Sequence, residues 1–75
     1  MKFCDRMNEL LTEKGWKQAD LVRASGMSDA QVYHLCSGRS KNPKLTTLLI
    51  LMNSFNVTLD ELVKGVDLPL DEVQK

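Results

Sequence analysis

Apolar side chains recur at helical spacing from the start of this chain. The first stripe occupies positions i, i+4, i+7 and i+8 of one helix face: Phe3, Met7, Leu10 and Leu11. Gly15 follows the stripe and predicts its end, because glycine readily adopts the left-handed conformation that closes a helix. A shorter helical pattern, about two turns long, covers residues 18–25 and stops at Gly26. The pattern therefore predicts two helices joined by a short connection.

The start of a third helix is marked by Ser28 and Gln31, which have the spacing of a capping box. In this motif the serine hydroxyl and the glutamine amide satisfy backbone groups that the first helical turn leaves without partners. The helix is predicted over residues 28–37, and Gly38 supplies its end. A tight glycine-containing turn at residues 26–28 joins it to the preceding helix, which is typical of a helix-turn-helix pair.

Two more helices complete the pattern. The fourth is predicted after Pro43 from a run of apolar positions: Leu45, Leu48, Leu49, Leu51, Met52 and Phe55. Thr58 and Glu61 form a second capping box, which opens a short fifth helix that ends at Gly65. We therefore expect an all-α fold, a compact five-helix bundle.

The chain of 75 residues has room for one domain, which we place at residues 1–65, followed by a tail at 66–75. Apolar residues make up 43% of the chain, enough for a folded core. No apolar run approaches the roughly 18 residues of a membrane span, and charged residues interrupt the N-terminal segment, so we expect a cytoplasmic protein. Cys4 and Cys36 lack the spacing of a zinc site or a disulfide framework, so we expect reduced thiols, no metal and no cofactor.

Charge is unevenly distributed along the chain, although the net charge is zero. Residues 17–44 carry five basic and two acidic side chains, a net charge of +3. Residues 45–75 carry two basic and five acidic side chains, a net charge of −3. Any contact with phosphate groups therefore belongs to the middle of the chain.

The outer face of the third helix is unusual for a solvated surface. Val32 and Leu35 set the direction of the core, and at 100° per residue the opposite face carries four residues without formal charge: Ala30, Tyr33, His34 and Ser37. An exposed helix face normally carries lysine and glutamate, so this composition indicates a contact surface. Three basic residues follow the helix where the phosphates of a bound duplex would lie: Arg39, Lys41 and Lys44.

These features together resemble the lambda-repressor-like, Cro/Xre helix-turn-helix family over about residues 3–65. The resemblance is carried by the order and spacing of a set of residues: Gln18, Leu21, Gly26, Ser28, Val32, Leu35, Gly38, Asn42, Pro43 and the segment 57–62. It implies a regulator of transcription, a repressor, that binds an operator in double-stranded DNA as a homodimer and inserts the third helix into the major groove.

Carried over by position, the resemblance implies two sets of DNA contacts. Base edges would be contacted from the third helix: Ser28, Asp29, Ala30 and His34, with Tyr33 adjacent. Phosphates would be held by a second set: Gln18, Ser37, Arg39, Lys41, Asn42 and Lys44. Asp29 and Ala30 depart from the long amide or guanidinium side chains common in the family. Asp29 either accepts a hydrogen bond from a cytosine amino group or stabilises the helix N-terminus, and the sequence leaves both roles open.

Three other positions carry structural expectations. Lys17 stands where the family commonly has a serine or threonine cap, so the second helix is expected to lose about 1 kcal/mol of capping. Cys36 is expected to be a packed thiol and Trp16 a core residue between the first two helices. The expected dimer surface is the fifth helix with its approach and part of the tail: Val57, Leu59, Leu62, Val63 and Leu68. Leu49 and Ile50 extend the apolar arc of the fourth helix and are further candidates for a subunit interface.

The sequence also bears on two other classes of function, a protein-interaction module and an enzyme. A protein-interaction module, such as an antitoxin or an adaptor that binds a protein through the third helix, is favoured by the zero net charge and by Asp29. An enzyme is not expected, because the sequence contains no paired carboxylates, nucleophile and base, metal cluster or phosphate-binding glycine loop. No small-molecule ligand is indicated.

Overall fold

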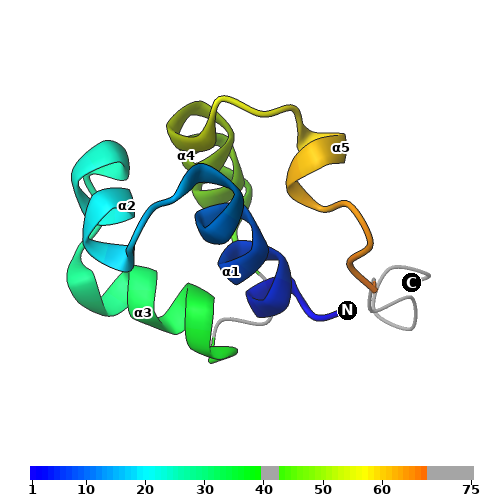
Figure 1. Cartoon of the computed structure of the whole chain (residues 1–75), viewed down its shortest axis with the longest axis horizontal. Helices are drawn as coiled ribbons and strands as arrows, with labels where there is room; N and C mark the ends of the chain where they lie inside the picture. Colours follow the sequence, from blue (N-terminus) through cyan, green and yellow to red (C-terminus); the bar gives the residue numbers. More distant parts are fainter. Residues whose placement is uncertain (40–42, 68–75) are drawn as a thin grey trace.

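A computed structural model describes residues 1–39 and 43–67 of the protein (Figure 1). The described residues form helices and no strands: α1 (Phe3–Lys14), α2 (Gln18–Ser25), α3 (Asp29–Ser37), α4 (Leu45–Phe55) and α5 (Leu59–Leu62). The all-α, five-helix architecture is thus confirmed. None of these helices is long and apolar enough to cross a membrane.

The local signals in the sequence set the helix boundaries. The backbone N–H of Gln31 donates to the Ser28 hydroxyl at 3.2 Å, and the Ser28 N–H donates to Oε1 of Gln31 at 3.1 Å. The same reciprocal pair joins Thr58 and Glu61 at 3.2 and 3.3 Å. Both predicted capping boxes are therefore confirmed, because a capping box needs only residues within one turn.

The start of α2 shows a compensation that the sequence analysis missed. Lys17 supplies no side-chain cap, as expected. However, Oδ2 of Asp20 accepts the Lys17 backbone N–H at 2.8 Å. Asp20, inside the helix, therefore forms one half of a capping box, and this bond offsets part of the expected loss of capping free energy in α2.

The core takes residues from all five helices and from the turn between α2 and α3. Its members are apolar and less than a tenth exposed: Phe3, Met7, Leu10, Leu11, Leu21, Met27, Val32, Leu35, Cys36, Leu51, Phe55 and Leu62. The first apolar stripe is therefore buried as predicted. Trp16 is half-buried, and its ring stacks on Phe55 with centroids 5.6 Å apart. Its partner is thus α4, a contact between residues far apart in sequence that the prediction between α1 and α2 did not include.

Two apolar residues do not lie where the sequence pattern placed them. Leu45 begins the apolar run of α4 but is 69% exposed, because the first turn of α4 extends beyond the core. Leu62 is fully buried, so its assignment to a dimer surface is wrong. The reason is that α5 packs its inner side against both α1 and α4, which leaves Leu62 no route to a partner subunit.

The other predicted dimer residues lie at different depths. Leu59 is 44% exposed, whereas Val57 and Val63 are half-buried against the core. Leu68 lies outside the described residues. On α4, Leu49 is 49% exposed and Ile50 is half-buried.

Arg6 is a buried charge that the sequence analysis did not identify. It is 5% exposed, and its Nε and Nη2 atoms both donate to the Glu61 carbonyl oxygen, the Nε bond being 3.0 Å long. Its Nη1 atom pairs with the Glu9 carboxylate and lies 3.5 Å from Oε2 of Glu13. The guanidinium therefore joins α1 to the backbone of α5, with its own charge compensated from within α1.

Candidate nucleic-acid interface

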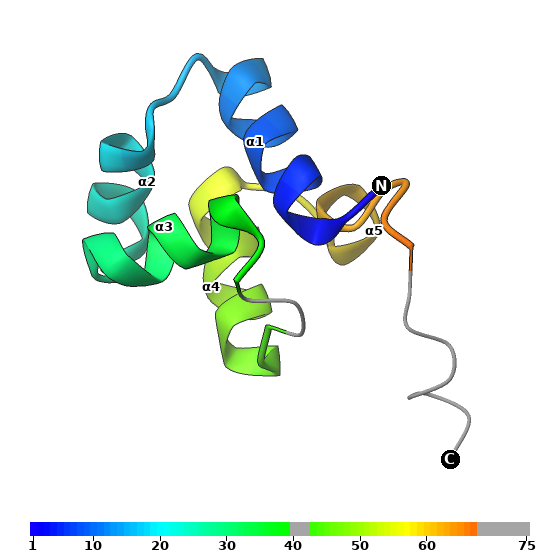
Figure 2. The same cartoon turned by 90° about the horizontal axis from the view of Figure 1, so that it is seen from below.

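The turn between α2 and α3 is built from three consecutive residues. Gly26 has φ of +75° and donates its N–H to the Val22 carbonyl at 3.0 Å, which ends α2. Met27 is buried, so the turn is anchored in the core, and Ser28 then caps α3. Figure 2 shows α2 and α3 side by side at one end of the molecule, and α2 also packs against α4. The predicted helix-turn-helix pair is present.

The outward face of α3 is exposed as its sequence predicts. Ser28, Asp29, Ala30, Tyr33 and Ser37 are all exposed, and Tyr33 is 55% exposed. On the opposite side Val32 and Leu35 are buried. The exposed face of α3 therefore carries a small residue, a phenol, hydroxyls and one carboxylate, and the buried face packs in the apolar core.

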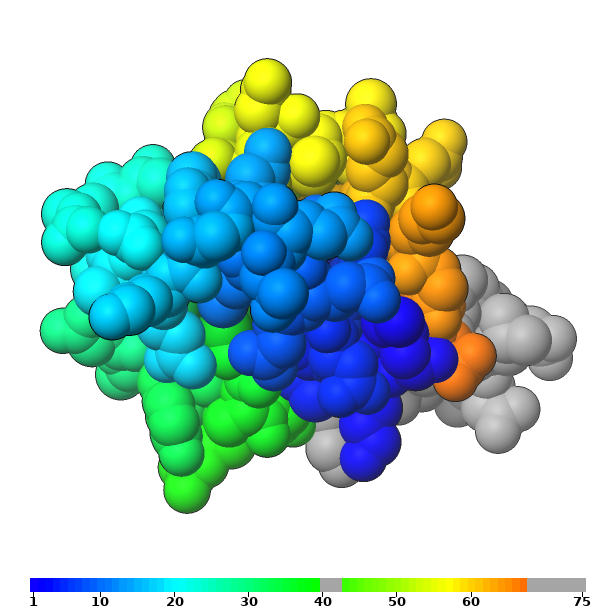
Figure 3. All heavy atoms as spheres, viewed as in Figure 1, coloured from blue at the N-terminus to red at the C-terminus, as the bar shows by residue number. Residues whose placement is uncertain are grey.

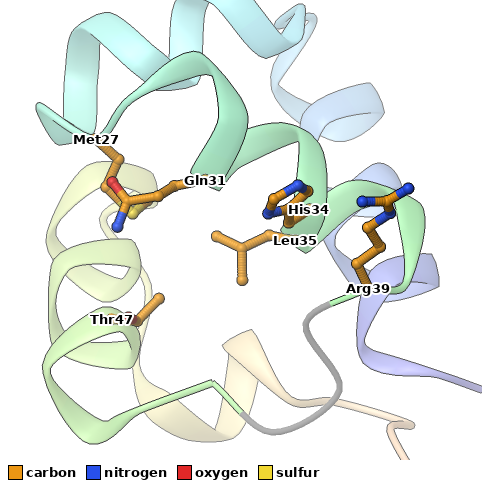
Figure 4. Close-up of a pocket in the computed structure, with 6 residues that line it drawn as sticks. All are labelled: Met27, Gln31, His34, Leu35, Arg39 and Thr47. Carbon is orange, nitrogen blue, oxygen red and sulfur yellow. The ribbon is translucent and has the colours of Figure 1, made fainter.

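His34 lies at the edge of this face. It is half-buried, and its ring centroid is 6.2 Å from that of Tyr33 with the planes tilted by 58°. With Gln31, Arg39 and Thr47 it lines a cavity of about 250 Å³ between α3 and the first turn of α4 (Figure 4). The helix period predicts His34 on the outer face, whereas the structure places it half-buried at the rim of this cavity.

Positive charge and backbone donors gather beside this cavity. Arg39 is exposed directly after the C-terminal glycine of α3, and Lys44 is exposed at the N-cap of α4. The N-cap residue Lys44 makes no side-chain hydrogen bond, so it leaves the first backbone N–H groups of α4 without a cap from its own side chain. A helix N-terminus of this kind attracts anions.

The remaining predicted phosphate contacts have different positions. Gln18 is the first residue of α2 and is exposed. Ser37 is exposed and its hydroxyl donates to the His34 carbonyl at 3.5 Å. Lys41 and Asn42 lie outside the described residues.

The thiol of Cys36 is buried behind the exposed face. Its 7% exposure agrees with the expectation of a packed side chain. Burial raises the pKa of the Cys36 thiol, and the neighbouring Cys4 adds to the shift. The group is therefore held as the neutral thiol, which is the less reactive form.

The comparisons agree with this geometry. The family model described as the Cro/C1-type helix-turn-helix DNA-binding domain matches residues 6–67. The chain belongs to this family. Its Cro/C1-type domain is also 36% identical over 67 residues to the HTH-type transcriptional regulator DdrOP3 of Deinococcus deserti. That match covers 89% of this chain and 51% of the relative, so the chain spans about half the length of the relative.

Membership fixes the broad biochemical class of the Cro/C1-type domain. It binds DNA, and its family is a family of DNA-binding domains and not of enzymes. The fold expected from the resemblance is therefore confirmed, and duplex DNA is the partner of this domain.

Proposed function

We propose that this protein is a sequence-specific regulator of transcription, a cytoplasmic repressor that inserts α3 into the major groove of its operator. The observation that carries the proposal is the exposed face of α3, which lacks the lysines and glutamates of a solvated helix and is followed by Arg39 and Lys44. Uncharged side chains suit contacts with base edges, and cations beside them suit the phosphates on either side of the groove. The name of the Deinococcus relative, a transcriptional regulator, supports the regulatory role.

The base contacts are assigned to the exposed residues of α3: Ser28, Asp29, Ala30 and Tyr33, with His34 at the edge. Ala30 and the Tyr33 ring offer apolar surface that suits the 5-methyl group of thymine. The Asp29 carboxylate only accepts hydrogen bonds, so it suits a cytosine amino group. The face contains no guanidinium for the bidentate recognition of guanine.

The phosphate contacts are assigned to the residues that the resemblance implies, of which Arg39 lines the cavity: Gln18, Ser37, Arg39, Lys41, Asn42 and Lys44. The N-terminus of α4 supports this assignment, because its N-cap residue Lys44 makes no side-chain hydrogen bond and its first turn lines the same cavity as Arg39. Backbone N–H groups at a helix N-terminus bind anions. These contacts supply affinity that is independent of sequence and dependent on salt.

Recognition of an operator requires a second copy of the chain. One α3 reads a single half-site, and a symmetric dimer reads two half-sites about one helical turn apart. Leu59 is the exposed apolar residue of α5, so the proposed contact centres on Leu59 with Val57 and Val63 at its margin. We assign the dimer to the DNA-bound state, because this surface is small.

The proposal is tested by selecting duplexes from a randomised pool with the purified protein. A sequence-specific regulator enriches a shared motif, and we expect two inverted half-sites in it. Recovery of duplexes without any shared motif would contradict sequence-specific binding. An excess of unrelated duplex in each round removes sequences held by phosphate contacts alone.

A second candidate function is a protein-interaction module that uses the α3 face. The exposed Asp29 at the start of this face favours it, because a carboxylate repels phosphate. In that case no duplex is enriched, and Asp29→Asn does not alter binding to DNA. Under the primary proposal, Asp29→Asn changes the preferred base at one position of the half-site.

A further inference from the structure

The C-terminal end of α3 is joined to α1 by one side chain. Nδ2 of Asn8 donates to the carbonyl oxygen of Cys36 at 2.9 Å, and to the carbonyl oxygen of Cys4 at 2.9 Å. Cys36 lies in the last turn of α3, where carbonyl groups have no partner within the helix. The amide of Asn8 therefore joins the backbone of α1 to that of α3, and Cys36 lies 28 residues after Asn8 in the sequence.

This end of α3 differs from the ends of its neighbours. Gly15, Gly26 and Asn56 each donate the backbone N–H to a carbonyl of the helix that they close. Gly38 closes α3 with φ of +94° but makes no such backbone bond to any residue in the described ranges. At this end the Ser37 hydroxyl donates to the His34 carbonyl, and the amide of Asn8, from a different helix, donates to the Cys36 carbonyl.

A second contact lies one turn away on the same side of α1. A Cβ atom added at Gly38 would lie 3.4 Å from Sγ of Cys4, so Cys4 packs directly against the closing glycine. Figure 3 shows α1 (blue) lying directly against the C-terminal part of α3 (green), in agreement with their packing. Cys4 and Asn8, one turn apart on α1, thus both contact the end of α3 just before Arg39.

We propose that Asn8 is a positioning residue for DNA recognition, which fixes the end of α3 relative to the core and so aligns its base contacts with its phosphate contacts. The inference rests on the proposed role of α3 in the major groove. Base edges are contacted from the start and middle of α3, whereas Arg39 follows its end. A helix free to pivot about its Ser28 cap would shift Ser37 and Arg39 relative to Ser28 and Asp29. Such a helix could still meet the phosphates of any duplex, but it would no longer hold base and phosphate contacts in register at the same time, as an operator requires.

The test compares Asn8→Ala with the wild-type protein on the selected operator and on a scrambled duplex of equal composition. We expect operator affinity to fall by about tenfold, as the loss of one well-placed hydrogen bond allows. Affinity for the scrambled duplex should change by less than about twofold, since phosphate contacts tolerate small shifts. Asn8→Asp, which keeps the shape and removes the donor, should behave in the same way.

Two control variants separate positioning from stability. The Thr12 hydroxyl, one turn along α1, donates only to the Asn8 carbonyl at 2.9 Å, so Thr12→Ala removes a bond that stays within α1. Thr58→Ala removes the cap of α5 and lowers the thermal midpoint without touching α3. Both should keep the ratio of specific to scrambled affinity, which for Thr58→Ala is measured on a single half-site because Thr58 adjoins the proposed dimer contact at Leu59.

The inference is overturned if Asn8→Ala and Asn8→Asp leave this ratio unchanged, or if Thr58→Ala lowers it equally at a matched thermal midpoint. Failure of the proposed function itself has a different signature. In that case the wild-type protein already shows no preference for any duplex over its scrambled form.

Discussion

Tyr33 is the most exposed large side chain on the outward face of α3. We expect Tyr33→Ala to lower operator affinity by about tenfold, and affinity for non-operator duplex by less than about twofold, because the ring contacts a base and not a phosphate. Fluorescence anisotropy with labelled duplexes measures both values. Tyr33→Phe separates the ring from its hydroxyl. Equal losses on both duplexes for Tyr33→Ala would contradict a base contact.

Single residues also show which features of the structure the sequence predicts and which it does not. The exposure of Ala30 and Tyr33 follows from a helix period counted from two core residues, and the structure agrees. The partial burial of His34 does not follow from the period, because it depends on the cavity that the folded chain forms beside α3. Asn8 gives no signal at all in the sequence, since its role depends on a carbonyl that only the folded chain brings near.

Arg6 connects helices whose relative placement the sequence does not specify. We expect Arg6→Ala to lower the free energy of unfolding by about 2 kcal/mol, because the Glu61 carbonyl loses its buried donor. Arg23→Ala is the matched control. Arg23 also pairs with an acid three residues away, Asp20, but its side chain is 74% exposed, so we expect a change within about 0.5 kcal/mol. Urea denaturation followed by circular dichroism compares the two, and equal losses would contradict a structural role for the buried guanidinium.

The helix boundaries were predictable because their determinants are local. The glycines that end α1, α2 and α3 and the two capping boxes act within one turn, and the structure confirms each of them. The predicted end of the fifth helix at Gly65 is wrong, because α5 already ends at Leu62 and Val63 follows as its C-cap. Burial was less predictable. Leu45 and Leu62 both fit an apolar pattern, yet one is exposed and the other is in the core, because the outcome depends on where α5 and α1 meet α4.

At the scale of the whole molecule, the proposed dimer predicts different effects for two similar leucines. Leu59→Asp should prevent cooperative binding to a two-half-site operator and leave binding to a single half-site unchanged. Aspartate is acceptable in the first turn of α5, so the helix should persist. Leu49→Asp is the matched control, because Leu49 has nearly the same exposure on α4. A loss of cooperativity with Leu49→Asp alone would place the interface on α4.

The separation of charge along the chain explains how a protein with no net charge binds DNA. The excess of basic residues lies between residues 17 and 44, which includes α2, α3 and the N-cap of α4. The acidic excess lies beyond residue 44 in the sequence, and Asp60 and Glu61 of α5 belong to it. The distribution could be calculated from the sequence, but its placement around the cavity between α3 and α4 required the fold.

The central claim, that α3 enters the groove with basic residues on the flanking phosphates, is tested most directly by the salt dependence of operator affinity. We expect the logarithm of the association constant to fall linearly with the logarithm of salt concentration, and Lys44→Ala to reduce the slope by about one per half-site. Lys64→Ala, which removes an exposed lysine after α5, should leave the slope unchanged. An affinity that does not change with salt, or equal slopes for the wild-type protein and Lys44→Ala, would contradict the account.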